Sequence, residues 1–233
     1  MIKAAVVIVA AGRGTRMGPG VDKLFIELAG RPVIAHTWQR LDACPSVERV
    51  ILVVRPEMED AFRALANAIG CTKPWQLTHG GAERQDSVWN GLEALPAGAE
   101  IVAIHDGARP CVTDKLVQAT NLAAHLHGAA VAAQSVTDTI KSSTDGSTVD
   151  RHLDRSTLWA VQTPQTFRVD VIRRALQEVR TRNLKVTDDT AACELIGQTV
   201  RLVPCSTPNP KVTTPADVPY VEMLLRSRPC DKC

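Results

Sequence analysis

Residues 4–18 read Ala-Ala-Val-Val-Ile-Val-Ala-Ala-Gly-Arg-Gly-Thr-Arg-Met-Gly. The first eight of them are apolar, and a run of this length is too short to cross a bilayer. Glycines and arginines follow at once without a cleavage-type ending, so the run is not typical of a signal peptide. A short, continuous, Val/Ile-rich run instead indicates a strand buried on both faces of a parallel sheet. We therefore expect a cytoplasmic protein whose first strand leads into a glycine-rich loop.

Apolar runs alternate with amphipathic, helix-length segments along the rest of the chain. The expected strands are residues 4–11, 50–55, 101–105, 129–136, 158–161 and 200–204. The expected helices are residues 32–43, 57–69, 87–95, 114–127, 169–180, 188–196 and 216–226. Such alternation is typical of βαβ units, so the sequence predicts an α/β fold with a mostly parallel sheet. The length of 233 residues suits a single large domain, residues 1–233.

The composition excludes several classes of function. A net charge of +2 is too small for a protein that coats a polyanion, and 3% of aromatic residues is too few for a stacking platform on single-stranded nucleic acid. We therefore expect neither a nucleic-acid partner nor a membrane. The seven cysteines are irregularly spaced, unlike a disulfide framework. Cys230 and Cys233 form a C-x-x-C pair, but we interpret residues 228–233 as a flexible tail rather than a metal or redox site.

One polar stretch, residues 138–156, interrupts the alternation of strands and helices. It contains Ser142-Ser143-Thr144-Asp145-Gly146-Ser147, a turn signal between two extended pieces. This pattern predicts a hairpin-like arm over about residues 137–157. A plain surface loop is the alternative, although long structureless loops are uncommon unless they are functional.

The glycine-rich loop is the first candidate site. Glycines let backbone N–H groups converge on an anion, so a loop of this kind after a first strand usually holds phosphates. A Walker loop requires Gly-Lys-Ser/Thr, which is absent here. A dinucleotide-binding turn requires a third glycine one residue before Gly18 and a helix directly after it. Neither requirement is met here, because the third glycine comes one residue late and the next expected helix begins only at residue 32. Arg16 and Lys23 would then reach over bound phosphates; a solvated basic loop is the alternative.

The second candidate site is the end of the expected strand 101–105. Asp106 follows this strand, and ligands of open α/β sheets bind at the carboxyl ends of the strands. One carboxylate together with substrate phosphates suits Mg²⁺. Arg109 could instead pair with Asp106. We interpret His105 as a packed residue at the strand end rather than a base.

Shorter motifs complete the set of candidates. Gly80 and Gly81 precede an expected helix that contains Ser87, and they offer backbone contacts to a base or a ribose, although alone they mark only a helix N-terminus. Three further pieces are uninformative in isolation. They are Thr137-Asp138-Thr139, Asp154-Arg155 and Asn209-Pro210-Lys211-Val212-Thr213.

Taken in order, these motifs resemble the 2-C-methyl-D-erythritol 4-phosphate cytidylyltransferase family. The series is A-A-G-x-G-x-R-M, D-K, G-G-x-E-R-x-D-S-V, H-D-x-A-R-P, D-T, D-R, T-P-Q and N-x-K-V-T, and it spans Ala4 to about Leu225. The resemblance implies a three-layer, Rossmann-like nucleotidyltransferase fold whose protruding β-arm clasps a second subunit in a homodimer. It implies transfer of CMP from CTP to methylerythritol phosphate, with release of pyrophosphate, in isoprenoid precursor biosynthesis by the non-mevalonate pathway. It also implies Mg²⁺ or another divalent cation.

The resemblance assigns roles to individual residues. Those implied in catalysis are Arg16, Lys23, Arg155 and Lys211. Those implied in CTP binding are Ala10, Ala11, Gly12, Gly14, Thr15, Gly81, Ser87, Asp106 and Gly107. Those implied in binding the sugar-alcohol phosphate are Asp106, Arg109, Thr139, Arg155, Thr163 and Lys211, with Arg155 reaching across the dimer interface. Asp106 is the implied metal ligand.

Four positions depart from the family pattern and keep alternatives open. Asp22 stands where proline is usual, and it could pair with Lys23. Ala82, Thr137 and Pro210 replace an acid, an arginine and an aliphatic residue respectively. A ribitol-5-phosphate cytidylyltransferase shares the loop and the Asp106 and Lys211 patterns. An NADP-binding protein, suggested by the glycines and Arg55, and an inactive protein of the same fold are the remaining alternatives.

Overall fold

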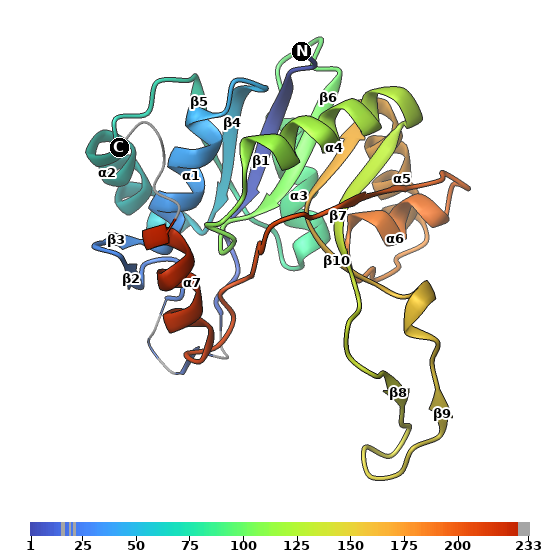
Figure 1. The fold of residues 1–233 in the computed structure, drawn as a ribbon. Helices are drawn as coiled ribbons and strands as arrows, with labels where there is room; N and C mark the ends of the chain where they lie inside the picture. Colours follow the sequence, from blue (N-terminus) through green and yellow to red (C-terminus); the bar gives the residue numbers. More distant parts are fainter. Residues whose placement is uncertain (15–16, 19, 21, 228–233) are drawn as a thin grey trace.

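A seven-stranded sheet forms the centre of the protein (Figure 1). The computed structural model describes residues 1–14, 17–18, 20 and 22–227. The strand order is β11-β7-β10-β6-β1-β4-β5. These strands are β1 (Ala4–Val9), β4 (Val47–Val54), β5 (Trp75–His79), β6 (Ile101–Asp106), β7 (Ala129–Ser135), β10 (Trp159–Arg168) and β11 (Arg201–Pro204). Within this seven-stranded sheet, the pairings of β10 are antiparallel and the others are parallel, so the mostly parallel sheet predicted from the sequence is confirmed.

Helices cover both faces of this sheet. Val6 and Ile8 of β1 belong to one buried cluster, whereas Val7 between them belongs to another. The first cluster includes side chains of α1 (Val33–Ala43), α2 (Glu59–Ile69), α4 (Asp114–His127) and α7 (Asp217–Ser227). The second includes side chains of α3 (Arg84–Glu93), α5 (Val169–Thr181) and α6 (Asp189–Glu194). The three-layer architecture therefore explains why β1 is apolar at every position.

The helices follow the predicted ranges closely, whereas two strands do not. The expected helix 57–69 begins with a separate 3₁₀ turn, Pro56–Met58, before α2. Strand β5 was not predicted, and the predicted strand 158–161 is wrong at its end, since β10 continues to Arg168. The extension is rich in Thr and Gln because those side chains bond inside the protein, as Gln165 does with Asp188 and the backbone of Asp189. Two further short strands, β2 (Glu27–Leu28) and β3 (Arg31–Pro32), pair with each other.

A ribbon leaves the sheet between β7 and β10. Its strands β8 (Lys141–Ser142) and β9 (Arg151–His152) are antiparallel, so the hairpin expected from the turn signal is present. The Asp145 carboxylate closes the tip by accepting hydrogen bonds from the backbone of Ser147 and Thr148. We call residues 137–157 the arm. Figure 1 shows the arm extending away from the body of the protein.

Two sequence expectations concern the membrane and the cysteines. Across the described part of the chain, no helix is both long enough and apolar enough to span a membrane. Cys44, Cys71, Cys193 and Cys205 are free thiols. The predicted tail 228–233, with its C-x-x-C pair, lies outside the described residues.

Helix α3 packs so closely on the sheet that we predict a Gly91→Ala substitution to be destabilising. The new Cβ would lie 2.5 Å from Cγ1 of Val7 and 3.1 Å from Cγ2 of Val53. Alanine gains about 1 kcal/mol over glycine in a helix, but overpacking a core costs about 1–3 kcal/mol. We expect the free energy of unfolding, measured with urea, to fall by up to about 2 kcal/mol. Gln177→Ala, at an exposed position of α5, is the control, and a more stable Gly91→Ala protein would contradict the packing argument.

Candidate functional site

The carboxyl ends of β1 and β6 border a cavity of about 440 Å³. The chain runs from β1 outward through β4 and β5, and then returns to place β6 on the other side of β1. The strand order thus reverses between β1 and β6, and such a reversal leaves a crevice where open α/β sheets bind ligands. The N–H of Gly107 donates to the carbonyl of Val9 at 3.1 Å and ties the two strand ends together. The volume suits a small-molecule ligand.

Most of the predicted site residues meet at this cavity. Those on its wall are Ala10, Ala11, Gly12, Lys23, Gly81, Ser87, Asp106, Gly107 and Lys211. Those away from its wall are Gly14, Arg109, Thr139, Arg155 and Thr163. Two others, Thr15 and Arg16, lie outside the described residues.

The glycine-rich loop and the second glycine pair lie directly against each other. A Cβ on Gly80 would fall 2.3 Å from Cβ of Ala11, so only glycine fits at this contact. Gly14 has a φ of +62°, and its Cα faces the Lys23 stem, since an added Cβ would lie 3.0 Å from Cγ and Cδ of Lys23. The glycines therefore allow the two segments and the lysine to form one wall.

Gly81 and Ser87 contact each other at the start of α3. The N–H of Gly81 donates to Oγ of Ser87 at 3.1 Å, and the Ser87 hydroxyl donates to the carbonyl of Glu83 at 3.2 Å. Glu83 and Asp86 form a reciprocal capping box at the same helix end. The turn is therefore held rigidly at the cavity wall.

Asp106 is the anionic centre of the site. Its carboxylate lies 2.9 Å from Nζ of Lys211 and 3.3 Å from Nε of Arg109, and the residue is only 8% exposed. Burial alone would raise the pKa of Asp106, but Lys211, Arg84 and Arg109 outweigh it and hold the pKa well below its ordinary value. The carboxylate is therefore ionised at neutral pH. The pairing with Arg109, left open by the sequence, is present.

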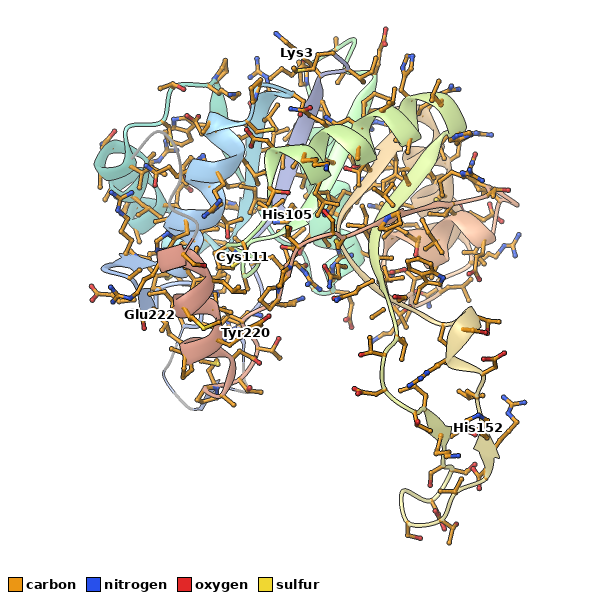
Figure 2. The ribbon with its side chains drawn as sticks, in the orientation of Figure 1. Lys3, His105, Cys111, His152, Tyr220 and Glu222 are labelled. Carbon is orange, nitrogen blue, oxygen red and sulfur yellow. The ribbon has the colours of Figure 1, made fainter. Side chains whose placement is uncertain are left out.

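A chain of hydrogen bonds supports Asp106 from behind. The backbone N–H of Asp106 donates to Oγ1 of Thr163 at 3.1 Å, and the Thr163 hydroxyl lies 3.0 Å from Nδ1 of His105. Nε2 of His105 lies 3.2 Å from the carbonyl of Arg109, so a neutral imidazole completes the chain. Burial lowers the pKa of His105 to about 4, although Asp106 opposes the shift. Figure 2 shows His105 inside the body of the protein, and its interpretation as a packed residue is confirmed.

Three arginines of the wall were not predicted as site residues, namely Arg13, Arg55 and Arg84. Nη2 of Arg84 lies 2.8 Å from Oδ2 of Asp189, a fully buried residue more than a hundred positions away in sequence, and Arg84 also lowers the pKa of Asp106. The signal for Arg84 was its position four residues after the first paired glycine. Nη2 of Arg55 lies 2.5 Å from Oδ2 of Asp22, because Arg55, directly after β4, reaches the carboxylate across the loop. A pairing of Asp22 with Lys23 stays a prediction.

The wall residues fit a divalent cation bound together with phosphates. In the described part of the chain, no three His, Cys, Asp or Glu side chains cluster as a metal cage would require. Asp106 nevertheless offers an ionised carboxylate at the cavity. Mg²⁺ usually takes one or two carboxylates and completes its coordination with water and substrate phosphates. The donor set therefore suits magnesium delivered with a nucleotide better than a permanently bound ion.

Residues 4–227 match the protein family described as 2-C-methyl-D-erythritol 4-phosphate cytidylyltransferase. The chain belongs to this family. The family enzyme of Pelotomaculum thermopropionicum is 42% identical over 98% of this chain and 96% of its own length. The enzyme of Geobacillus kaustophilus is 43% identical over 95% of this chain and 96% of its own length.

Solved structures of the family share the fold. The crystal structure of 4-diphosphocytidyl-2C-methyl-D-erythritol synthase from Anaerococcus prevotii matches with a TM-score of 0.85 at 29% identity, over 97% of this chain and 96% of that one. The cytidylyltransferase structure from Thermus thermophilus matches with a TM-score of 0.78 at 30% identity, over 97% of this chain and 100% of that one. The nucleotidyltransferase architecture expected from the motifs is therefore confirmed.

The neutral, buried His105 makes the free energy of unfolding of the protein depend on pH. An unfolded histidine binds a proton below about pH 6.5, whereas the native His105 resists protonation down to about pH 4. Its contribution is therefore present above pH 6.5 and is lost as the pH falls toward 4. We expect the free energy of unfolding to lose up to about 3 kcal/mol from this group over that interval.

The measurement is urea unfolding between pH 7 and pH 4.5 for the native protein and a His105→Asn variant. Asparagine does not titrate, so the variant should lose less stability on acidification. Burial also lowers the pKa of His36, but His36 is present in both proteins and cancels in the difference. Parallel pH profiles for the two proteins would contradict a buried neutral His105.

Proposed function

We propose that the protein transfers CMP from CTP to 2-C-methyl-D-erythritol 4-phosphate and releases pyrophosphate, a step of the non-mevalonate route to isoprenoid precursors. The observation that carries this proposal is the cavity at the ends of β1 and β6, where Asp106 and Lys211 meet the glycine-rich loop. Family membership over residues 4–227 supports the choice of substrates. The same cavity would hold the nucleotide and the attacking phosphate together.

The reaction needs charge neutralisation more than it needs a base. A phosphate oxygen of the acceptor forms a bond to the α-phosphorus of CTP, and the bond to the bridging oxygen of pyrophosphate breaks. A phosphate monoester has a second pKa near 6 and is mostly dianionic at neutral pH, so no side chain must remove a proton. The buried, neutral His105 agrees with this requirement, because it is bonded on both ring nitrogens away from a ligand. Positioning and cations then account for the acceleration.

The lysines of the wall are the proposed sources of positive charge. Lys23 comes from the glycine-rich loop and Lys211 from the segment after β11, so they approach the cavity from different sides of the sheet end. We propose that Lys23, with Arg16, neutralises the α-phosphate during attack. Lys211 would bind the phosphate of the acceptor, with Asp106 and Arg109 fixing its position.

The nucleoside end of CTP is proposed to lie on the two glycine segments. Backbone groups of Ala10, Ala11 and Gly12 line the cavity beside Gly81 and Ser87, and they are suited to bonds with a base or ribose. Mg²⁺, when bound, would neutralise charge on the triphosphate and on departing pyrophosphate. Asp106 is its proposed protein ligand.

We further propose that the chain acts as one nucleotidyltransferase unit that dimerises through its arm. A two-stranded ribbon is at best marginally stable in water by itself, and most of the arm is exposed in one chain. Arg155 and Thr139 belong to the arm and not to the cavity wall of their own chain. A partner subunit that receives the arm would bring Arg155 to its cavity, which would explain why this proposed site residue is absent from the cavity wall of its own chain.

The reaction itself is the first prediction of this proposal. We expect pyrophosphate release when the protein is incubated with CTP, Mg²⁺ and methylerythritol phosphate, and little release with UTP or ATP. Chelation by EDTA should stop the reaction and excess Mg²⁺ should restore it, because the triphosphate charge is then neutralised again. Ribitol 5-phosphate is tested in parallel. Faster turnover of ribitol 5-phosphate would replace the proposed acceptor, and no release from a folded sample would overturn the proposal.

Subunit complementation tests the origin of Arg155. Lys211→Met and Arg155→Ala should each lose on the order of a hundredfold in turnover, the usual cost of one well-placed charge. A heterodimer of the two variants, isolated with two affinity tags, contains one complete site if Arg155 acts on the partner. It should therefore recover about half of the native turnover per dimer, as an isologous dimer requires.

The matched control is a heterodimer of Lys211→Met and Lys23→Met. Both lysines line the same cavity of one chain, so neither site of this heterodimer is complete and no recovery is expected. Equal recovery in both heterodimers, or none in either, would contradict a site shared between subunits.

A further inference from the structure

One arginine contacts both ends of the glycine-rich loop. Arg55 follows β4, and its Nη1 donates to the carbonyl of Gly12 at 3.3 Å. Its Nη2 lies 2.5 Å from Oδ2 of Asp22, ten residues further along the chain. Its Nε donates to Glu57 at 3.2 Å, which fixes the guanidinium from the outside. Arg55 thus spans the base of the loop from its first glycine to the residue before Lys23.

Asp22 links this contact to the turn that carries Lys23. Its Oδ1 accepts the N–H of Leu24 at 3.0 Å, and its carbonyl accepts the N–H of Phe25 at 3.0 Å. One carboxylate oxygen of Asp22 therefore binds Arg55, and the other accepts the backbone N–H of Leu24 and so fixes the turn that contains Lys23. The side chains of Arg55 and Asp22 are only 14% and 21% exposed, so salt screens this pair less than an open surface pair.

The charges around Arg55 argue against a role as a phosphate receptor. Asp22 and Glu57 together offset its single positive charge. Removal of Arg55 would leave the carboxylate of Asp22 without its guanidinium partner beside a cavity proposed to hold a triphosphate. Arg55 was one of the features that suggested an NADP-binding protein, because an arginine at the end of the second strand can bind the 2′-phosphate of NADP. The contacts of Arg55 with Asp22 and Glu57 leave that alternative without support.

We infer that Arg55 is a positioning residue for nucleotidyl transfer, which closes the base of the loop between Gly12 and Asp22 and thereby holds Lys23 on the cavity wall. The inference rests on the proposed function, because Lys23 is assigned there to the α-phosphate. The planar fork of arginine is needed, since two separate nitrogens bind the two ends of the loop. A lysine at this position has the charge but cannot span both ends.

Steady-state kinetics of four variants test this role. They are Arg55→Met, Arg55→Lys, Asp22→Asn and the double variant Arg55→Met with Asp22→Asn. We expect each single substitution to lower kcat about tenfold, within the range measured for coupled ion pairs. The double variant should lose no more than the single ones, because both substitutions open the same contact. KM for the acceptor phosphate should stay unchanged in all four.

KM for CTP separates positioning from direct binding. Arg55→Met should raise it, since Asp22 then repels the triphosphate, and the double variant should return it to near the native value. Arg55→Lys should keep KM for CTP near native while kcat falls. A protein in which Arg55 binds the phosphates directly would behave differently: Arg55→Met would raise KM equally with and without Asp22, and that result would overturn the inference.

Hydrogen exchange provides a readout that does not depend on activity. Loss of Arg55 should speed exchange of the Leu24 amide, which donates to Asp22. Arg182→Met is the matched control, because it removes an arginine from an exposed pair with Glu178 on α5, remote from the cavity. If the native protein releases no pyrophosphate, the proposed function fails, and hydrogen exchange still tests whether Arg55 holds the base of the loop. Unchanged exchange at Leu24 in Arg55→Met would overturn the inference.

Discussion

An ionised carboxylate at the end of β6 is the constraint on which the site depends. Asp106 is almost fully buried, and a buried charge is costly unless it is paired and hydrogen-bonded. Its partners come from separate parts of the chain: Arg109 from the next turn and Lys211 from the segment after β11. Arg84, at the start of α3, adds to the same field. The need to neutralise one carboxylate therefore gathers distant segments around the cavity.

The same arrangement prepares the cavity for a polyanion. Ion pairs already orient the cations around Asp106, and the side chain of Arg109 is largely buried, so little reorganisation is needed when phosphates arrive. A nucleotide brings both negative charge and, with it, a divalent cation. In the proposed function, the carboxylate of Asp106 would hold the metal while Lys211 would bind a phosphate oxygen. A wall of unpaired lysines would bind anions too, but it would repel the metal that accompanies them.

Much of the fold follows from patterns that are local in sequence. The apolar runs of β1, β4 and β6 are buried on both faces, and the periodic segments became helices close to the expected bounds. Strand β5 escaped prediction because its residues, Trp-Gln-Leu-Thr-His, are only partly buried at the edge of the sheet. The second half of β10 was not predicted because its polar residues are buried. Thr163 and Gln165 are buried, but they look like surface residues until their partners on other strands and helices are known.

The site divides in the same way between local and distant information. The absence of Gly-Lys-Ser/Thr excludes a Walker loop, and the position of Asp106 after a buried strand indicates the ligand edge, since both depend on neighbours in sequence. The pair of Arg55 with Asp22 could not be predicted in this way, because these two residues are neighbours only in the folded sheet. Parallel pairing of β1 with β4 brings the residue after β4 to the mouth of the loop after β1. Sheet topology thus brings Arg55 to Asp22, and under the proposed role of Arg55 this departure from the family pattern supports Lys23 instead of weakening its hold on phosphate.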